Sequence, residues 1–283
     1  MARDLNKTLY VSDMDGTLLG PDARLTRRSA ELLNRAISGG VKFTVATART
    51  PATVEPLLED VAMRLPAIVM TGAARWHFDT ETYSHLRFIS QGHVRTILSI
   101  LDQGGIFPFV YTLPPDSNRL TVFYSNPSPS AADLKFIEQR RGLKLKTFVL
   151  DTKLPPDRSD RVLLFFASGD YTSLGRAAEQ ISAMTQCSVS CYDDIYNPGL
   201  GLIEIFAPEV SKASAIEELK ADYEASQVTV FGDNLNDLPM FAVADTSVAV
   251  ENACESVKCA ADIVIGPNTS DAVPEYLLKT LDF

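Results

Sequence analysis

The first indication of a fold class is the stretch Thr8-Leu-Tyr-Val-Ser-Asp-Met-Asp-Gly-Thr17. Its first residues, Thr8 to Val11, are β-branched, apolar or aromatic, which predicts a short buried strand. An acidic turn, Ser12 to Gly16, follows directly. The carboxyl end of a strand is the usual place for a site in an open α/β sheet. The stretch therefore predicts a sheet strand that ends in a site.

Strands and helices alternate after this stretch. A helix capped by Thr26 is expected before a second strand at 41–46. Another helix begins at Pro51, and a third strand is expected at 67–70. This alternation predicts a parallel sheet with right-handed crossovers.

The pattern changes after about Arg75, where several β-rich runs and Pro-rich loops leave room for only a few helices. Those helices are expected near 91–103, 130–141 and 171–185. This composition is typical of a separate α+β domain. The alternating pattern resumes after Gly201 with Leu-Ile-Glu-Ile-Phe, which is interpreted as a strand of the first domain.

The predicted fold class is therefore α/β, with a doubly wound, Rossmann-like parallel sheet core and an inserted α+β cap domain. The core is expected to comprise residues 1–80 and 205–283, and the cap residues 81–204. A length of 283 residues suits one such core and a smaller domain.

Composition limits the possible partners. Hydrophobic residues make up 46% of the chain and charged residues 22%, as in ordinary globular proteins. The net charge of −10, without a dense Lys/Arg run, argues against nucleic-acid binding. No apolar run approaches the roughly 20 residues of a membrane helix, and the first residues lack the apolar stretch of a secretory signal. We therefore expect a cytoplasmic protein without nucleic-acid or membrane partners. The pattern does not indicate an oligomeric state.

The cysteines and histidines do not form a metal-binding pattern. The four cysteines contain no CxxC pair and do not cluster with the histidines. Reduced, mostly buried thiols are expected instead of disulfides or a zinc site. These residues are Cys187, Cys191, Cys254, Cys259, His77, His85 and His93.

Asp13 and Asp15 form the first candidate site. Two carboxylates one residue apart can share Mg²⁺, a hard cation that prefers oxygen ligands. One carboxylate could then attack phosphorus, while the other transfers a proton. Gly16 permits the sharp turn that this arrangement needs. The alternative is an acidic turn without chemistry.

Thr47 and Arg49 form the second candidate site, at the start of the helix that Pro51 opens. The Thr47 hydroxyl and the first N–H groups of the helix could donate to a phosphate oxygen. The alternative is helix capping, for which Thr50 is the better candidate. Arg49 is expected either to contact the substrate or to lie on the surface.

Two further candidates lie near the end of the chain. Lys212 begins a helix, although the helix dipole disfavours a cation there. It could neutralise a phosphate and a nucleophilic carboxylate together, or lie on the surface. The run Phe231 to Asp237 follows a β-branched strand and brings two more carboxylates and two amides to a strand end. Such groups could complete a magnesium shell and hold a phosphate oxygen.

In this order, the four patches resemble the haloacid-dehalogenase-like superfamily, and their spacing resembles its Cof-type branch of sugar-phosphate phosphatases. The resemblance covers both core segments and the position of the insert. It implies a Mg²⁺-dependent phosphatase of small phosphorylated metabolites, with sugar phosphates as the substrates typical of the branch. The insert would be a lid that excludes water and gives selectivity.

The resemblance also implies a role for each residue. Asp13 would be the nucleophile and a Mg²⁺ ligand, and Asp15 the general acid/base that offers its carbonyl to the metal. Thr47 and Lys212 would bind the phosphoryl group. Three residues of the late run complete this set: Asp233 as a metal ligand, Asn236 as a phosphate contact, and Asp237 as the holder of a metal-bound water or of Lys212.

The sequence departs from the branch at several positions. Ala48 and Ala272 replace glycines that are usual there, Thr71 replaces Asn, and Glu251 precedes Asn252-Ala253 where glycine is typical. None is a carboxylate or lysine of the expected site, so substrate fit is affected more than chemistry.

Two alternatives to a phosphatase remain open. A phosphoryl transferase or mutase would use the same aspartyl-phosphate. A receiver-like signalling protein also combines acidic residues, a phosphorylated Asp, a Thr and a Lys. The long insert and the late acidic run argue against a receiver, because receivers are compact single domains.

Overall fold

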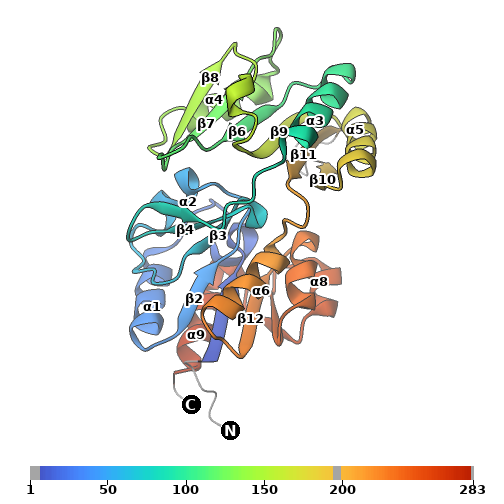
Figure 1. Ribbon diagram of the computed structural model, residues 1–283. Coiled ribbons are helices and arrows are strands. Elements are labelled where there is room, and N and C mark those ends of the chain that lie inside the picture. The colour runs from blue at the N-terminus through green and yellow to red at the C-terminus, as the bar shows by residue number, and fades with distance from the viewer. Residues whose placement is uncertain (1–6, 194–198, 282–283) are drawn as a thin grey trace. The chain divides into compact units, whose positions relative to one another are not determined.

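The protein, described by a computed structural model over residues 7–193 and 199–281, divides into two compact units (Figure 1). The core unit comprises residues 1–84 and 211–283, and the inserted unit comprises residues 85–210. These divisions lie four and six residues beyond the expected ones, at 80/81 and 204/205, for reasons given below.

The core unit contains a parallel five-stranded sheet. Every neighbouring pair of strands in it is parallel, which confirms the expected α/β fold. All five residues of the interior strand at Thr8–Ser12 are buried, as expected when helices cover both faces of a parallel sheet. The order is β14 (Ile263–Ile265), β13 (Thr246–Val250), β12 (Gln227–Gly232), β1 (Thr8–Ser12) and β2 (Lys42–Val45).

The expected third strand, β3 (Ala67–Val69), adjoins β2 through a parallel bridge between Ala46 and Ile68. It also begins a small antiparallel sheet with β4 (Ala74–His77) and β5 (Thr82–Ser84). This sheet extends the core unit to residue 84, because its last strand pairs within that unit.

The strand order reverses between β1 and β12. From β1 the chain moves outward to β2, whereas β12 is followed by β13 and β14 on the other side. Ligands of open α/β sheets bind at such a reversal, beyond the carboxyl ends of the strands. Asp13 lies at this point because it directly follows β1.

Six α-helices belong to the described part of the core unit, and their ends follow the expected signals. Thr26 caps the first of them, where its hydroxyl oxygen accepts a hydrogen bond from the N–H of Ser29 at 2.9 Å. The first helix packs against the last, and α6 packs against α7. The helices are α1 (Arg27–Ser38), α2 (Pro51–Leu58), α6 (Lys212–Asp222), α7 (Leu238–Ala242), α8 (Glu255–Ala260) and α9 (Ala272–Lys279).

The inserted unit contains a six-stranded sheet in which only the β7–β8 pair is parallel. Its three helices fall where the sequence predicts them: α3 (Gln91–Gln103), α4 (Ala131–Arg140) and α5 (Tyr171–Thr185). The strand order is β10 (Ser188–Asp193), β11 (Leu200–Phe206), β9 (Val162–Asp170), β6 (Phe109–Thr112), β7 (Leu120–Tyr124) and β8 (Lys146–Leu150).

The assignment of Leu-Ile-Glu-Ile-Phe to the core was wrong. These residues belong to β11, which pairs antiparallel with β9 and β10 inside the inserted unit. Local pattern could not decide this, because an apolar run alone does not name its partner strand. The strand therefore moves the second division from the expected 204/205 to 210/211.

The helices of the inserted unit cover both faces of its sheet. Neighbouring residues of a strand point to opposite faces. The ring of Phe109 contacts the ring of Phe136 on α4, with centroids 4.9 Å apart. Val110, the next residue, lines a cavity together with residues of α3. Thus α4 covers one face of the sheet and α3 the other.

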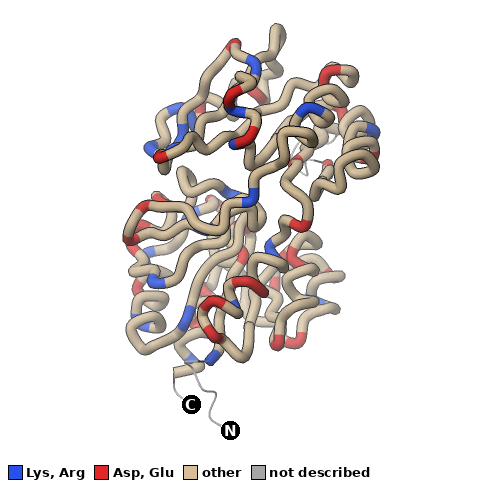
Figure 2. Tube along the Cα trace, in the orientation of Figure 1, with Lys and Arg blue, Asp and Glu red and all other residues tan. Residues whose placement is uncertain are grey.

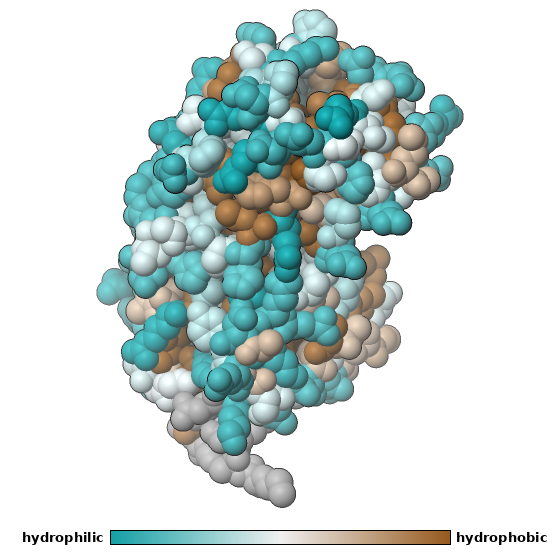
Figure 3. Space-filling view, in the orientation of Figure 1, coloured by the Kyte–Doolittle hydropathy of each residue, from teal (hydrophilic) through white to brown (hydrophobic). Residues whose placement is uncertain are grey.

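The face of the molecule drawn in Figure 3 is mostly polar. Charged residues are distributed over both units (Figure 2), and teal and white residues cover most of the face shown in Figure 3. No helix within residues 7–193 and 199–281 has both the length and the apolar character of a membrane span. The expectation of mostly buried thiols was wrong for Cys254 and Cys259, which are exposed beside or within the short helix α8.

Candidate active site

Asp13 is held at the end of β1 by the neighbouring strand. Its N–H donates to the carbonyl oxygen of Phe231 on β12 at 2.9 Å, and the residue is only 6% exposed. The turn that follows contains Gly16 at a φ of +80°. A β-carbon at Gly16 would collide with the carboxylate of Asp233. Glycine is therefore needed both for the backbone conformation and for the close approach of these two segments.

The hydrogen bonds of Lys212 explain why a lysine lies at the start of α6. Its ammonium donates to Asp13 Oδ1 at 2.5 Å and to Asp237 Oδ1 at 2.9 Å. All three side chains are buried. The two carboxylates offset the unfavourable helix dipole at this position. An exposed surface lysine, the alternative interpretation, is thereby ruled out.

The short helix α6 is positioned by a tight contact with the turn after β3. Gly72 has a φ of +103°. A β-carbon there would collide with the carbonyl oxygen of Ser211, the residue before Lys212. The absence of a side chain at Gly72 therefore sets how closely the start of α6 approaches this turn.

Burial dominates the electrostatics of this group. Burial raises the pKa of Asp13 to about 7, Lys212 lowers it, and Asp237 raises it further. Burial alone would lower the pKa of Lys212, but the carboxylates of Asp13 and Asp237 outweigh it and hold the pKa above its ordinary value. Lys212 is therefore a cation at neutral pH, and the pKa of Asp13 lies well above its ordinary value.

The loop after β12 supplies the remaining carboxylates. Asp237 Oδ2 accepts hydrogen bonds from the N–H groups of Asp233 and Asn234, at 3.1 and 3.2 Å. Asp233 Oδ1 accepts from the Thr17 hydroxyl at 2.8 Å. Burial raises the pKa of Asp233 to about 6, although the Thr17 hydrogen bond lowers it. These bonds fix the loop against the turn that carries Asp13.

The carboxylates of Asp13, Asp233 and Asp237 fit a hard cation. Each offers an oxygen, and these oxygens lie within 4.8 Å of one another. Three carboxylates around one ammonium leave an excess of negative charge, which a divalent ion would offset. The carboxylate of Asp15 is not in this group. Any contribution of Asp15 to the metal would therefore come from its main chain, as the resemblance implies.

Asp15 pairs with Arg49 in a two-point interaction. Arg49 Nε donates to Asp15 Oδ2 at 2.7 Å, and Nη2 donates to Oδ1 at 2.5 Å. The Asp15 side chain is 52% exposed, so solvent weakens the pair and it can open. The hydrogen bond to Asp15 raises the pKa of Arg49. Sequence alone did not indicate this partner for Arg49.

The other predicted residues lie outside this hydrogen-bonded group. Thr47 is 1% exposed, and its hydroxyl oxygen accepts from the N–H of Arg49 at 3.1 Å. Thr50 occupies the N-cap position of α2, but its hydroxyl makes no capping bond, contrary to expectation. Asn236 lies exposed within the 3₁₀ turn Leu235–Asp237.

Two asparagines and Thr17 were missed as parts of the site. Asn252 Nδ2 donates to the carbonyl oxygen of Gly16 at 2.8 Å, and its Oδ1 accepts from the N–H of Asn268 at 2.9 Å. Asn268 Nδ2 in turn donates to the carbonyl oxygen of Leu19 at 2.8 Å. These bonds hold the turn after Asp13 against the C-terminal segment of the chain. The Asn252-Ala253 motif was the only sequence signal for them.

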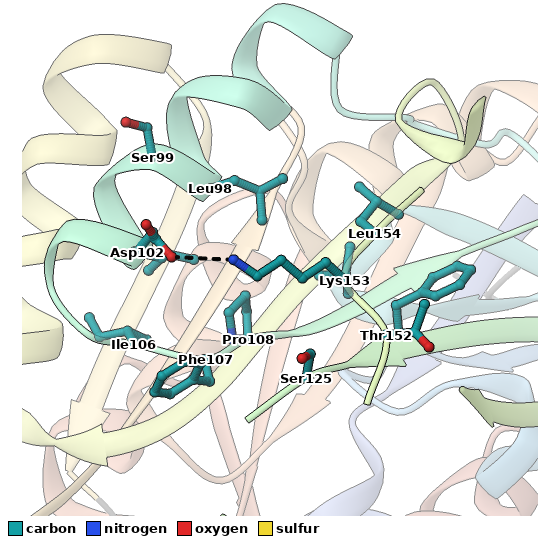
Figure 4. A pocket seen from close by; sticks show the side chains of 13 residues that line it. Leu98, Ser99, Asp102, Ile106, Phe107, Pro108, Ser125, Thr152, Lys153 and Leu154 are labelled. Atoms are coloured by element: carbon teal, nitrogen blue, oxygen red, sulfur yellow. Dashed lines mark ion pairs between the residues drawn. The ribbon is translucent and has the colours of Figure 1, made fainter. Parts of the chain in front are cut away.

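A separate cavity of about 330 Å³ lies within the inserted unit (Figure 4). The side chains of Asp102 and Lys153 form a 3.8 Å ion pair across it, and both are largely exposed. Most of the other lining side chains are apolar, among them Leu98, Phe107 and Leu154. The cavity has no cluster of carboxylates, so it is not a candidate for the chemistry described above.

Known proteins similar to this chain were found both by sequence and by fold, and the two comparisons agree. A family model described as haloacid dehalogenase-like hydrolase matches residues 10–277. The chain is 25% identical to the pyridoxal phosphate phosphatase YbhA of Escherichia coli, covering 95% of this chain and 97% of that protein. It is also 25% identical to the 5-amino-6-(5-phospho-D-ribitylamino)uracil phosphatase YwtE of Bacillus subtilis, covering 95% and 96%.

The fold is similar to that of a solved haloacid dehalogenase-like hydrolase from Bacteroides thetaiotaomicron. The TM-score is 0.76 at 20% identity, and the match covers 96% of this chain and 98% of that one. The likeness extends over nearly the whole of both chains, inserted unit included.

Proposed function

The chain belongs to the haloacid dehalogenase-like hydrolase family, and from this premise we propose that it is a Mg²⁺-dependent phosphatase of small phosphorylated metabolites. Hydrolysis would proceed through an aspartyl-phosphate on Asp13. Sugar phosphates are the first substrate class to examine, beside the phosphates that its relatives' names identify.

One observation carries this proposal: a buried Asp13 bonded to a buried cation, Lys212, beside two further carboxylates. A carboxylate without a proton is a nucleophile, and the ammonium next to it can also attract a phosphate dianion. The names of the two relatives add support, because both proteins are phosphatases of small molecules.

In the first step, an oxygen of Asp13 attacks phosphorus and the bond from phosphorus to the leaving oxygen breaks. Asp15 donates its proton to that oxygen, so that a neutral alcohol departs. Lys212 and the Thr47 hydroxyl would hold the transferring group in line with Asp13. Arg49, which pairs with Asp15 in the structure, must release the carboxylate for this step.

In the second step, Asp15 accepts a proton from a water molecule whose oxygen attacks the same phosphorus. The bond between phosphorus and Asp13 breaks, which restores the carboxylate and yields inorganic phosphate. Asp13 and Asp233 would hold Mg²⁺, together with the main chain of Asp15, whereas Asp237 would chiefly hold Lys212. Bound Mg²⁺ would offset the repulsion between the carboxylates and the incoming phosphate.

A screen of phosphorylated metabolites, with Mg²⁺ and with a chelator, tests the proposal directly. We expect phosphate release that requires Mg²⁺ and no acceptor molecule. Release only when an acceptor sugar is present would instead support the phosphoryl transferase or mutase. Phosphorylation of the chain without turnover of any ester would support the receiver-like protein.

Asp15→Asn is expected to reduce turnover by about 10²–10⁴-fold, because it removes the proton donor and acceptor. The rate of the first step should fall more with a sugar phosphate than with 4-nitrophenyl phosphate, because the nitrophenolate leaving group needs no proton. Rapid-mixing measurements should therefore show about one equivalent of nitrophenol released quickly, followed by slow turnover. Asp22→Asn, which changes an exposed aspartate, is the control and should retain wild-type turnover.

Mg²⁺ is expected to stabilise the protein more at pH 8 than at pH 5. The pKa values of Asp13 and Asp233 are raised to about 7 and about 6, so the metal-free folded state binds more protons than the unfolded state between about pH 4 and pH 7. Without metal, stability should therefore fall as pH rises through this window. At pH 8 the carboxylates repel one another and bind the ion without proton competition.

Thermal unfolding with Mg²⁺ and with a chelator checks this expectation. Mg²⁺ at 100 times its Kd would add about 2.7 kcal/mol to the free energy of unfolding at pH 8. Asp233→Asn should lose most of this increment, whereas Asp22→Asn should keep it. An increment that is the same at pH 5 and pH 8 would contradict the role assigned to the raised pKa values.

A further inference from the structure

The ammonium of Lys146, the first residue of β8 in the inserted unit, has no charged partner among the residues that the structure describes. The residue is 2% exposed. Its main chain is bonded, since the carbonyl oxygen accepts from Arg119 Nη2 at 3.2 Å. Its ammonium, however, makes no hydrogen bond or ion pair with any residue in 7–193 or 199–281.

Lys146 lies on the face of the sheet that α4 covers. In β8 it lies two residues before Phe148, whose ring contacts the ring of Phe136 on α4. The ammonium lies 5.1 Å from the centre of the Tyr111 ring. The guanidinium of Arg140 stacks over Phe136, with its carbon 4.1 Å from the ring centre. The aromatic rings of this face thus surround two cationic side chains.

The charges around Lys146 increase the cost of its burial. Burial lowers the pKa of Lys146 to about 7, and the positive charge of Arg140 lowers it as well. No carboxylate of a described residue acts appreciably on this lysine. Burial is the main cause of the raised pKa of Tyr111, and the negative charge of Glu204 raises this pKa further. The Tyr111 hydroxyl consequently keeps its proton and can donate it.

A buried ammonium without a partner, beside a second positive charge, is unfavourable unless an anion compensates the ammonium. The aromatic face of Tyr111 offsets only part of this cost. An oxyanion would accept charge-assisted hydrogen bonds from Lys146 and the Tyr111 hydroxyl, and would also be attracted by Arg140. The opening must be small, because Lys146 and Tyr111 are only 2% and 3% exposed.

We propose that the α4 face of the inserted unit's sheet carries a binding site for one oxyanion group, a carboxylate or a phosphate, held by Lys146, Tyr111 and Arg140. Nothing in the phosphatase chemistry assigned to the core unit uses these residues. The oxyanion could belong to a phosphorylated substrate with a second anionic group, or it could be a separate small anion.

Calorimetric titration with malonate in magnesium-free buffer tests the site in the full chain. We expect saturable binding to the wild type and about ten-fold or weaker binding to Lys146→Met, since one charge-assisted contact is lost. Lys135→Met, which changes an exposed lysine of α4, should bind malonate like the wild type. Lys146→Met should melt at the wild-type temperature or above it, because a buried charge is removed.

Two results would overturn the proposal. One is the absence of saturable malonate binding to the wild type, which does not depend on how any variant folds. The other is equal affinity of the wild type and a folded Lys146→Met variant, which would place malonate elsewhere on the chain.

Kinetics with Mg²⁺ identify the source of the oxyanion. If the substrate carries it, Lys146→Met should lower kcat/KM about ten-fold for 4-carboxyphenyl phosphate and leave 4-nitrophenyl phosphate unchanged. If it is a separate ligand, malonate should change the turnover of both esters alike, and only in proteins that retain Lys146. A wild type that hydrolyses neither ester would count against the proposed function alone, because calorimetry does not require turnover.

Discussion

Asp13→Asn is expected to abolish turnover, with a loss of about 10⁴-fold or more in kcat. The amide is a far weaker nucleophile than the carboxylate and cannot be displaced as readily from phosphorus. The change replaces one side-chain oxygen by nitrogen and leaves the volume of the site almost unaltered. Steady-state phosphate release and single-turnover trapping of the phosphorylated chain would measure the loss.

The fold should survive this change, which separates chemistry from structure. Burial raises the pKa of Asp13 to about 7, so the carboxylate costs the folded state free energy that a neutral amide does not. The melting temperature should therefore equal or exceed that of the wild type. Asp60→Asn, at an exposed position of the same unit, serves as the control. Wild-type turnover by Asp13→Asn would refute the assigned nucleophile.

Lys212→Met is expected to damage both stability and activity. Removing the ammonium leaves Asp13 and Asp237 buried without their shared cation. Breaking a buried pair in this way typically costs about 3–5 kcal/mol of unfolding free energy. Loss of the cation from the phosphate site should lower kcat by about 10²–10³-fold as well. Urea unfolding and phosphate release measure the two effects separately.

The stability loss of Lys212→Met should depend on pH. The raised pKa of Lys212 means that its contribution is fully present below the unfolded lysine pKa and is lost only in strongly alkaline solution. In the variant, Asp13 can take a proton at pH 5, which relieves the repulsion from Asp237. The destabilisation should therefore be smaller at pH 5 than at pH 8. Lys279→Met, at the exposed end of α9, should show neither effect.

Local sequence was sufficient for most elements and for the family. The three helices of the inserted unit follow from apolar spacing and from breakers at their ends, and the match over residues 10–277 confirms the expected family. Asp13 could be placed at a strand end because its preceding residues form a short apolar run. The unusual lysine at a helix start was informative because the helix dipole disfavours it.

Contacts between distant segments could not be predicted in the same way. β11 has the composition of a buried strand, and only its neighbours assign it to the inserted sheet. The pairing of Arg49 with Asp15 depends on how the start of α2 faces the turn after β1. The clamp formed by Asn252 and Asn268 joins chain segments that sequence spacing does not relate.

The bond between Lys212 and Asp13 joins residues 199 positions apart. During translation, β1 therefore leaves the ribosome long before its neighbour β12 has been made. The edge of β1 that pairs with β12 therefore stays unpaired until the inserted unit and β12 have been synthesised. A chain that ends anywhere between Asp13 and Lys212 would contain the aspartate but not the cation beside it, and we expect such fragments to be inactive.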